Sequence, residues 1–408
     1  MADPLSKKGS FKSLTIEGKI RLMKKPYVCI VTTTLYAENL KQFLDNAITL
    51  MRPISNLHVI TGNFPNRYDN VEVIEVERNC GRLKNESLSF RLLQNVKAQL
   101  KITFEFINNS SKFQIVCFHS GEYLNLLPCI MAKLLRKKII IFHLGGNKLL
   151  EARKAVHSTF ERTLVAFGWT LFMRTCYSIA DIVACESPSI VQFAGLNRFT
   201  KKIAPNIGRF VDTYFSMRIP ISKRGKKVGY IGRIVEEKGI VPFSDAVPLI
   251  LARDNSIGFQ IIGDGTLLLE IEKRICSGPT KNSVIFEGWI AQKSLPEHLN
   301  SLSVLVVPSY TEGVPGIIQE AMACGTIVLA TPVGGIPDLV RDHQTGFLLR
   351  DNTPEEIANS VISIFNSHSL SEISKNAMNL IEKEYTFQSV LNRYKSMLDK
   401  LIEAQPYH

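Results

Sequence analysis

Two glutamates lie on either side of a turn that is predicted to open a helix. Glu312 follows residues 304–308, VLVVP, which have the pattern of a buried strand, and Glu320 lies within residues 317–324, which have the pattern of a helix that ends at Gly325. Ligands of open α/β sheets bind where strands end and helices begin. Glu312 can accept hydrogen bonds from the hydroxyls of a sugar there, and Glu320 can reach a second pair of hydroxyls, such as those of a ribose.

The backbone between these carboxylates is a candidate phosphate site. Gly313, Gly316 and Ile317 lie at the start of the predicted helix, where the first N–H groups lack internal acceptors and the helix dipole places partial positive charge. One turn can thus hold sugar, phosphate and ribose. The alternative is that Glu312 is a solvated loop residue and Glu320 an ordinary acid of the first helical turn.

A second candidate site lies upstream, in residues 228–239, VGYIGRIVEEKG, which read as a strand, a glycine turn and the start of a helix. Gly232 allows a tight turn beside Arg233, and Lys238 follows one to two turns later. The planar guanidinium offers paired donors and the lysine a mobile point charge, so the two cations can clamp a diphosphate. The alternative is a pair of solvated charges at a helix start.

Further strand patterns end in glycine, at Gly263 to Gly265 and at Gly288, and each is followed by a helical pattern, as in a parallel sheet. In the N-terminal half, residues 113–118, 126–135 and 138–146 read as strand, helix and strand. His143 lies where the last of these strands meets a glycine loop. The alternative for His143, and the favoured interpretation of His119 at another strand end, is a structural histidine.

These motifs together resemble those of the retaining GT-B glycosyltransferases of family 4, the glycosyl transferases group 1. The resemblance is carried by the following segments, in this order: Gly232-Arg233 with Lys238, Gly263-Asp-Gly265, Phe286-Glu-Gly288, the pair Glu312 and Glu320, Glu320-Ala-Met-Ala-Cys-Gly325, Pro332-Val-Gly-Gly-Ile-Pro337 and Gly346-Phe-Leu348. It is dense over residues 203–390 and thin over the first 140.

The resemblance implies an α/β fold of GT-B architecture, in which two Rossmann-like parallel-sheet domains face each other across a cleft. We expect the following division: a flexible basic tail (1–25), an N-terminal acceptor-side domain (26–212), a C-terminal nucleotide-sugar-binding domain (213–385) and a C-terminal helix that crosses back to the first domain (386–408). Residues 181–187 are expected to close the first sheet, and residues 202–212 resemble the family's connector.

The resemblance also implies the activity, a retaining and metal-independent transfer of a hexosyl-type sugar from a nucleotide diphosphate to a hydroxyl acceptor. The roles that it implies are these: Arg233 and Lys238 bind the diphosphate, Glu320 the ribose and Glu312 the transferred sugar, and His143 faces the donor sugar. Gly313, Gly316 and Ile317 supply backbone donors, the base lies near the turns of Gly263 and Gly288, and Gly232 and Gly265 also belong to the nucleotide-sugar site. No cofactor is expected beyond the donor substrate. The family's usual glycine pair after the first strand is missing from residues 32–40, which leaves the acceptor side open.

Charge is unevenly divided between the two halves of the chain. Residues 1–210 carry 30 Lys and Arg against 15 Asp and Glu, whereas residues 211–408 carry 19 against 22. A basic acceptor-side half suits an anionic membrane surface or a polyprenyl- or lipid-linked acceptor. The sequence lacks the motifs typical of nucleic-acid-binding proteins.

The most apolar run, residues 164–173, is too short to span a bilayer and reads either as an interfacial segment or as a core helix. With no signal peptide recognised, we expect a cytoplasmic protein, peripheral on the inner face of the membrane. The eight scattered cysteines are expected to be buried reduced thiols. A catalytically silent subunit that only binds nucleotide sugar and a sugar-nucleotide epimerase remain as alternative functions.

Overall fold

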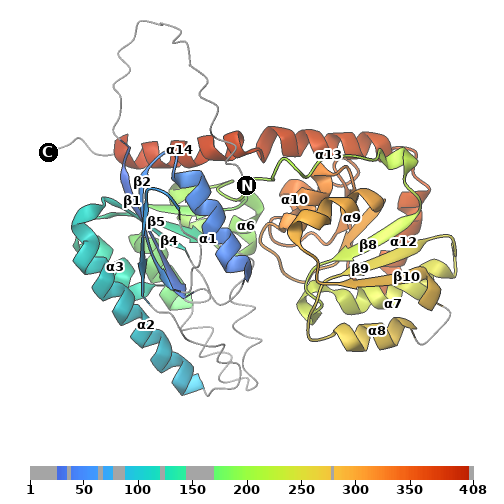
Figure 1. Ribbon diagram of the computed structural model, residues 1–408, viewed down its shortest axis with the longest axis horizontal. Helices are drawn as coiled ribbons and strands as arrows, with labels where there is room; N and C mark the ends of the chain where they lie inside the picture. Colours follow the sequence, from blue (N-terminus) through green and yellow to red (C-terminus); the bar gives the residue numbers. More distant parts are fainter. Residues whose placement is uncertain are drawn as a thin grey trace, which may run out of the picture.

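The computed structural model describes residues 25–34, 38–62, 68–76, 88–119, 125–143, 170–276 and 280–403. The expectations for the tail before residue 25, for the loop 35–37 and for most of the run 164–173 lie outside these residues. Within them the chain forms two α/β bodies side by side, bridged along one edge by the C-terminal helices (Figure 1).

The N-terminal body contains a seven-stranded parallel sheet in the order β3-β2-β1-β4-β5-β6-β7. Its elements are β1 (Tyr27–Thr34), α1 (Glu38–Met51), β2 (Asn56–Gly62), β3 (Val71–Glu75), α2 (Leu88–Asn109), β4 (Ile115–His119), α3 (Leu126–Leu134), β5 (Lys138–His143), β6 (Ile182–Cys185), α6 (Pro188–Phe193) and β7 (Ile203–Ala204). The sequence interpretation closed this sheet at residues 181–187, which contain β6. That expectation was wrong: β7 pairs with β6 beyond it, and a two-residue strand is too short to show a period-two pattern.

The C-terminal body contains a six-stranded parallel sheet in the order β10-β9-β8-β11-β12-β13. Its strands are β8 (Lys227–Ile231), β9 (Gly258–Ile262), β10 (Val284–Gly288), β11 (Val304–Val307), β12 (Ile327–Ala330) and β13 (Phe347–Leu348). Its helices are α7 (Ile240–Leu251), α8 (Leu268–Cys276), α9 (Leu295–Ser301), α10 (Gly316–Ala323), α11 (Ile336–Leu339), α12 (Pro354–Phe365) and α13 (Leu370–Glu384). The two Rossmann-like parallel sheets confirm the expected GT-B fold class.

Strand β11 shows why the central strands read as continuous apolar runs. Val304 and Val306 lie in the core layer on one face of the sheet, and Leu305 and Val307 lie in the layer on the other face. Successive side chains of a strand point to opposite faces, so a strand covered on both sides needs apolar residues at every position. The carboxyl end of such a strand is the first place where polar chemistry can begin.

The last helix, α14 (Phe387–Glu403), crosses back onto the N-terminal body, as expected (Figure 1). Its buried face comprises Val390, Tyr394, Met397, Leu398 and Leu401, which pack in the same cluster as the residues of β1 and α1. Spacing of three and four residues places these side chains on one helical face. The exact domain boundaries given above stay predictions.

Among the side chains that the structure describes, six cysteines are buried free thiols: Cys29, Cys117, Cys129, Cys176, Cys185 and Cys324. Burial raises the pKa of the Cys185 and Cys324 thiols to about 12, so both are protonated and unreactive at neutral pH. Of the apolar run 164–173, the described part lies in a helix over residues 170–179, with Phe172 and Met173 against the core and Leu171 exposed. Among the helices that the structure describes, none is long and apolar enough to cross a membrane.

Candidate functional site

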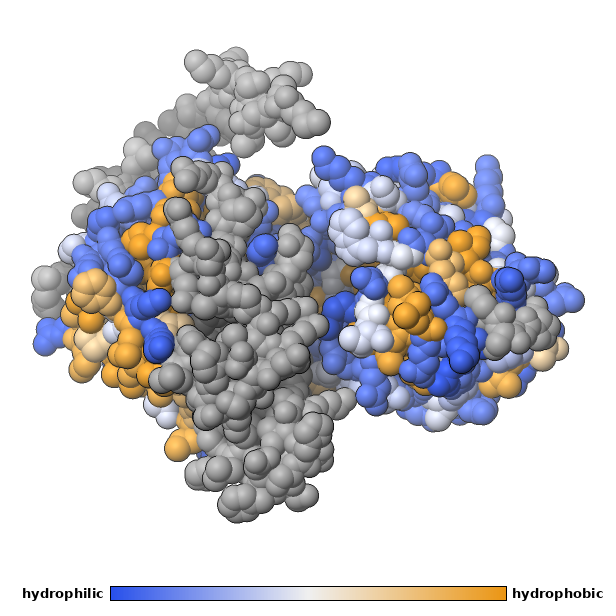
Figure 2. All heavy atoms as spheres, turned by 60° about the horizontal axis from the view of Figure 1, so that its bottom comes forward, coloured by the Kyte–Doolittle hydropathy of each residue, from blue (hydrophilic) through white to orange (hydrophobic). Residues whose placement is uncertain are grey.

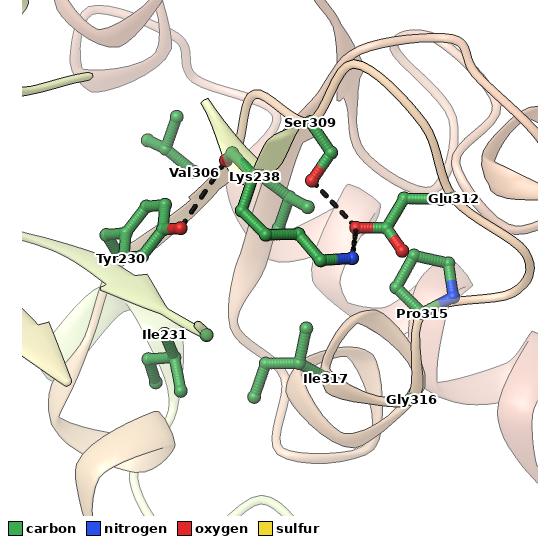
Figure 3. Close-up of a pocket in the computed structure, with 11 residues that line it drawn as sticks. Tyr230, Ile231, Lys238, Val306, Ser309, Glu312, Pro315, Gly316 and Ile317 are labelled. Atoms are coloured by element: carbon green, nitrogen blue, oxygen red, sulfur yellow. Dashed lines mark hydrogen bonds and ion pairs between the residues drawn. The ribbon is translucent and has the colours of Figure 1, made fainter. Parts of the chain in front are cut away.

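A cavity of about 200 Å³ opens at the carboxyl ends of β8 and β11. Its walls come from both of these strands and from the loop and first turn of α10 (Figure 3). The lining residues are Tyr230, Ile231, Gly232, Lys238, Val306, Val307, Ser309, Glu312, Pro315, Gly316 and Ile317. Five residues assigned from the sequence, Gly232, Lys238, Glu312, Gly316 and Ile317, therefore meet in one place, although they come from segments more than 70 residues apart.

Glu312 and Lys238 form an ion pair at the cavity wall. Lys238 Nζ lies 2.7 Å from Glu312 Oε1, and Ser309 Oγ donates to the same oxygen over 2.7 Å. The side chain of Glu312 is 10% exposed and that of Lys238 22% exposed. The carboxylate is thus held by a cation and a hydroxyl in a partly desolvated site, where electrostatic interactions are stronger than in water.

The turn that carries Lys238 is fixed by backbone packing against β11. Lys238 lies in a 3-10 turn (Glu236–Lys238) that precedes α7, and Gly239 follows with φ of +70°. A Cβ at Gly239 would lie 1.9 Å from the carbonyl oxygen of Pro308, so only glycine fits there. The Tyr230 hydroxyl donates to the carbonyl of Arg233 over 2.8 Å and braces the same turn.

Arg233, the other proposed diphosphate ligand, lies at the surface. Its guanidinium pairs with Glu237 at 2.6 Å, and its side chain is 61% exposed. The two cations expected to form a clamp therefore have separate acidic partners in this structure, Glu312 for Lys238 and Glu237 for Arg233. The role of Arg233 stays a prediction.

Glu320 lies in the second turn of α10 with only 6% of its side chain exposed. The interpretation of Glu320 as an ordinary first-turn acid is therefore wrong. Its Oε1 accepts from Arg209 Nη2 over 2.7 Å and from Gln292 Nε2 over 3.4 Å. A buried carboxylate needs such donors, because an unpaired buried charge is costly.

Arg209 and Gln292 were not identified from the sequence. Arg209 lies in the connector, and its guanidinium also covers Gly316, where a Cβ would lie 1.9 Å from Arg209 Nη1. Gln292 accepts a hydrogen bond of 2.9 Å from Gln42 of α1 and so joins the two bodies. The sequence signal that could have identified Arg209 as a site residue was its position in a segment that resembles the family's connector. No sequence signal pointed to Gln292.

The glycine turns expected near the base pack against one another at the ends of β8, β9 and β10. Gly263 has φ of +142°, and its Cβ would lie 1.9 Å from the carbonyl oxygen of Gly232. Its N–H donates to the carbonyl of Gly288 over 2.7 Å. A Cβ at Gly265 would meet the carbonyl oxygen of Ile234 at 2.2 Å. Close backbone packing alone therefore requires glycine at Gly263 and Gly265, and the contact with a base stays a prediction.

The segment Pro332 to Pro337 supports the loop of Glu312 from behind. Gly335 N–H donates to the carbonyl of Gly313 over 2.7 Å, and a Cβ at Gly334, with φ of +61°, would lie 2.0 Å from the carbonyl oxygen of Glu312. This hydrogen bond to its carbonyl holds Gly313 in place in the loop. A larger residue at Gly334 would displace the loop that holds the carboxylate.

His143 ends β5 in the N-terminal body and is buried. Its Nδ1 lies 2.7 Å from the hydroxyl of Tyr177. The glycine loop that follows lies outside the described residues, so the position of His143 relative to a sugar stays a prediction. His119 is also buried, stacks on Phe142 at 4.4 Å between ring centroids, and has a pKa that burial lowers to about 3, in agreement with a structural role.

Across the described ranges, no group of three or more His, Cys, Asp and Glu is arranged to hold a metal ion.

The two bodies are joined at another point by Ser189, whose N–H and hydroxyl each donate to the carboxylate of Asp338 over 2.8 Å.

Comparisons with known proteins agree with this geometry. Residues 225–367 match the family model described as glycosyl transferases group 1. An uncharacterised glycosyltransferase of Methanocaldococcus jannaschii is 26% identical over 301 residues, which is 71% of this chain and 76% of that relative. The capsular polysaccharide biosynthesis glycosyltransferase CapM of Staphylococcus aureus is 27% identical over 43% of this chain and 46% of its own length.

Among solved structures, that of Anabaena HepE in complex with UDP superposes with a TM-score of 0.67, covering 93% of this chain and all of that chain at 17% identity. A likeness at this identity establishes the fold. Fold and family match together define the chain as a glycosyltransferase of the GT-B class. The match to the glycosyl transferases group 1 covers residues 225–367, which lie in the C-terminal body.

Proposed function

We propose that the chain transfers a hexosyl-type sugar, with retention of the anomeric configuration, from a nucleotide diphosphate to a hydroxyl of a lipid-linked or surface glycan. The observation that carries the donor half of this proposal is the convergence of Lys238 and Glu312 at one cavity beside the start of α10. The names of relatives such as CapM, which acts in capsular polysaccharide biosynthesis, favour a glycan acceptor.

In this proposal Lys238 exchanges partners when the donor binds. Its Nζ, now on Glu312, neutralises the diphosphate together with Arg233, which leaves its surface partner Glu237. Glu312 is then released to bind hydroxyls of the donor sugar. Glu320 binds the ribose, and the N–H groups of Gly316 and Ile317 reach a phosphate or sugar oxygen.

The transfer breaks the bond between the anomeric carbon and the diphosphate oxygen and forms one from that carbon to the acceptor oxygen. The departing diphosphate oxygen takes the acceptor's proton, so atoms and charge balance. Glu312 stabilises the positive charge that develops on the sugar, and His143 positions the sugar across the cleft. Lys238 and Arg233 stabilise the leaving group, which is why no metal is needed in this scheme.

Isothermal titration with UDP-, GDP- and ADP-glucose tests the donor half. We expect one of the three to bind, and Lys238→Ala to weaken that binding at least tenfold. Normal binding to Lys238→Ala would refute the donor site. Nucleotide release that depends on an added glycan acceptor distinguishes the transferase from a silent subunit, and the absence of an altered nucleotide sugar among the products distinguishes it from an epimerase.

We also propose that the N-terminal body contacts an anionic membrane surface, where a lipid-linked acceptor would lie. The supporting feature is an apolar face on α2 and α3, seen on the left of Figure 2 among the apolar atoms of this body. Its exposed side chains are Val96, Leu100, Phe104 and Ile107 on α2, and Leu127, Ile130, Leu134 and Leu135 on or just after α3. The most exposed are Phe104 at 63% and Leu134 at 68%.

The cations around this face favour a bilayer of acidic lipid as its occupant. Lys97 and Lys101 on α2, and Lys133 and Arg136 at the end of α3, are all exposed. An apolar helix face flanked by cations binds the interface through buried apolar area and attraction to acidic headgroups.

Sedimentation with vesicles of phosphatidylglycerol and phosphatidylcholine at low salt tests this surface. We expect Phe104→Glu and Leu134→Glu to abolish binding, and the control Leu269→Glu, at an exposed position of α8, to bind normally. Vesicle binding unaffected by either change refutes the surface. A change in mass by light scattering, with no vesicle binding, would assign the face to self-association instead.

A further inference from the structure

Arg209 contacts two residues of the proposed donor site from outside the C-terminal sheet. It lies in the connector between β7 and β8, and its side chain is 22% exposed. Its guanidinium forms an ion pair with Glu320 at 2.7 Å and lies over Gly316, the first residue of α10. One side chain therefore covers two points that the proposed function assigns to the donor, the carboxylate for the ribose and the backbone for the phosphate.

We propose that Arg209 is an internal competitor of the donor, and that the nucleotide must displace it from Glu320 and Gly316 to bind. This inference rests on the proposed function, since it takes Glu320 and Gly316 as donor contacts. Glu320 Oε1 already accepts from Arg209 and from Gln292. A ribose hydroxyl that donates to the same carboxylate carries no charge of its own, whereas the contact of Arg209 with Glu320 is an ion pair, so the arginine is a strong competitor for this oxygen.

The position of Arg209 is fixed by the N-terminal body, although its side chain reaches the C-terminal one. Next to it in the connector, the carbonyl of Gly208 accepts from the hydroxyl of Tyr394 on α14 over 3.3 Å, and Ile207 N–H donates to the carbonyl of Cys185 in β6 over 2.9 Å. The ion pair is thus a contact between the bodies. Its loss on donor binding frees one tie between them.

A second contact links the same carboxylate to the N-terminal body. Gln42 of α1 donates to Gln292 over 2.9 Å, and Gln292 donates to Glu320. Both neighbours of the carboxylate are therefore linked to the N-terminal body. The arrangement of the two bodies and the occupation of Glu320 are coupled, since a donor that displaces Arg209 also breaks one of the contacts between the bodies.

The size of the effect follows from how often the pair is formed. If the pair is formed nine-tenths of the time, the competent state is one-tenth populated and the apparent affinity falls about tenfold. We therefore expect Arg209→Gln to bind the nucleoside diphosphate five- to tenfold more tightly than the natural protein does. A purely structural Arg209 would give the opposite sign, because its loss would disturb the site.

Titration calorimetry with UDP, GDP and ADP on the full-length protein provides the test. The dissociation constant of whichever nucleotide binds is measured for the natural protein and for Arg209→Gln, Arg209→Lys and Lys238→Ala. The control is Arg253→Gln, at a surface arginine that donates to Asn359. We expect Arg209→Lys to lie between the natural protein and Arg209→Gln. A circular-dichroism melt confirms that each variant is folded.

Unchanged or weaker binding by a folded Arg209→Gln, with Lys238→Ala weakened as expected, overturns the competitor and leaves the donor site in place. A weaker Arg209→Gln would make Arg209 a ligand of the nucleotide. Normal binding by Lys238→Ala instead refutes the donor site itself, so the two failures are distinguishable. If Arg209→Gln does not fold, Arg209→Lys, which keeps the positive charge, provides the same comparison of nucleotide affinity with the natural protein.

Discussion

Replacing Glu312 by Gln separates a catalytic carboxylate from a structural one. The amide has nearly the same shape, and its oxygen can still accept from Lys238 and Ser309, whose donors both lie 2.7 Å from Oε1. What is lost is the negative charge. The cavity should therefore keep its form while the charge that faces the sugar disappears.

The magnitude can be worked from these contacts. The bond from Ser309 becomes neutral, and the ion pair with Lys238 becomes a hydrogen bond from a cation to a neutral amide oxygen. Since charge-assisted bonds are roughly twice as strong as neutral ones, the change costs about 1 kcal/mol of folding free energy or somewhat more. Loss of a preorganised electrostatic contact to the transition state costs on the order of 10²- to 10³-fold in kcat. Nucleotide affinity should change less than about threefold, because Glu312 is assigned to the sugar rather than to the nucleotide.

The assay is single-turnover and steady-state nucleotide release, with calorimetric titration of the nucleoside diphosphate. Glu270→Gln is the matched control, since Glu270 pairs with Arg274 at the surface over 3.0 Å. A kcat for Glu312→Gln within threefold of the natural protein would remove Glu312 from the mechanism. A parallel loss of nucleotide affinity would place it on the nucleotide instead.

Three predictions concern the framework. Gly239→Ala should destabilise the protein by several kcal/mol and abolish donor binding, because its Cβ would lie 1.9 Å from the carbonyl oxygen of Pro308. In the control Gly258→Ala, the added Cβ would meet nothing within 4 Å, so calorimetric titration should show unchanged donor binding. Burial lowers the pKa of His119 from 6.5 to about 3, so on acidification the unfolded state binds the proton first. The free energy of unfolding should therefore fall as the pH drops from about 6.5 towards 3, by at most about 1.4 kcal/mol per pH unit. His119→Phe should flatten this decline in urea unfolding, and an unchanged slope would show that His119 is not its cause. Leu398→Ala on the buried face of α14 should cost about 2–5 kcal/mol, and a loss below 1 kcal/mol in chemical denaturation would mean that α14 contributes little to the first body.

Much of the fold was accessible from local pattern. The strands that end at Ile231, Ile262 and Val307 are apolar runs followed by glycine or proline, and the helix α14 has a regular apolar face. These signals are strong because burial on both faces of a parallel sheet, or on one face of a helix, repeats along the chain. The two-residue β7 carries no repeat and was missed for that reason.

The candidate site was accessible only in part. Glu312, Lys238 and Gly316 were found because each stands beside a strand end or a helix start, and the structure brings them to one cavity. Arg209 and Gln292 were missed, since an arginine in a connector and a glutamine in a short turn look like ordinary surface residues.

By itself the sequence determined the parallel α/β pattern and the residue types at the ends of the strands, because these follow from short-range periodicity. The two-domain arrangement and the returning C-terminal helix were expected only from the family resemblance. Only the tertiary structure decided which charges meet. Lys238 pairs with Glu312 across 74 residues and Arg209 with Glu320 across 111, whereas Arg233 takes the local partner Glu237. A charge can pair with any opposite charge within reach, and reach over such separations is set by how the sheets and the connector are placed in space.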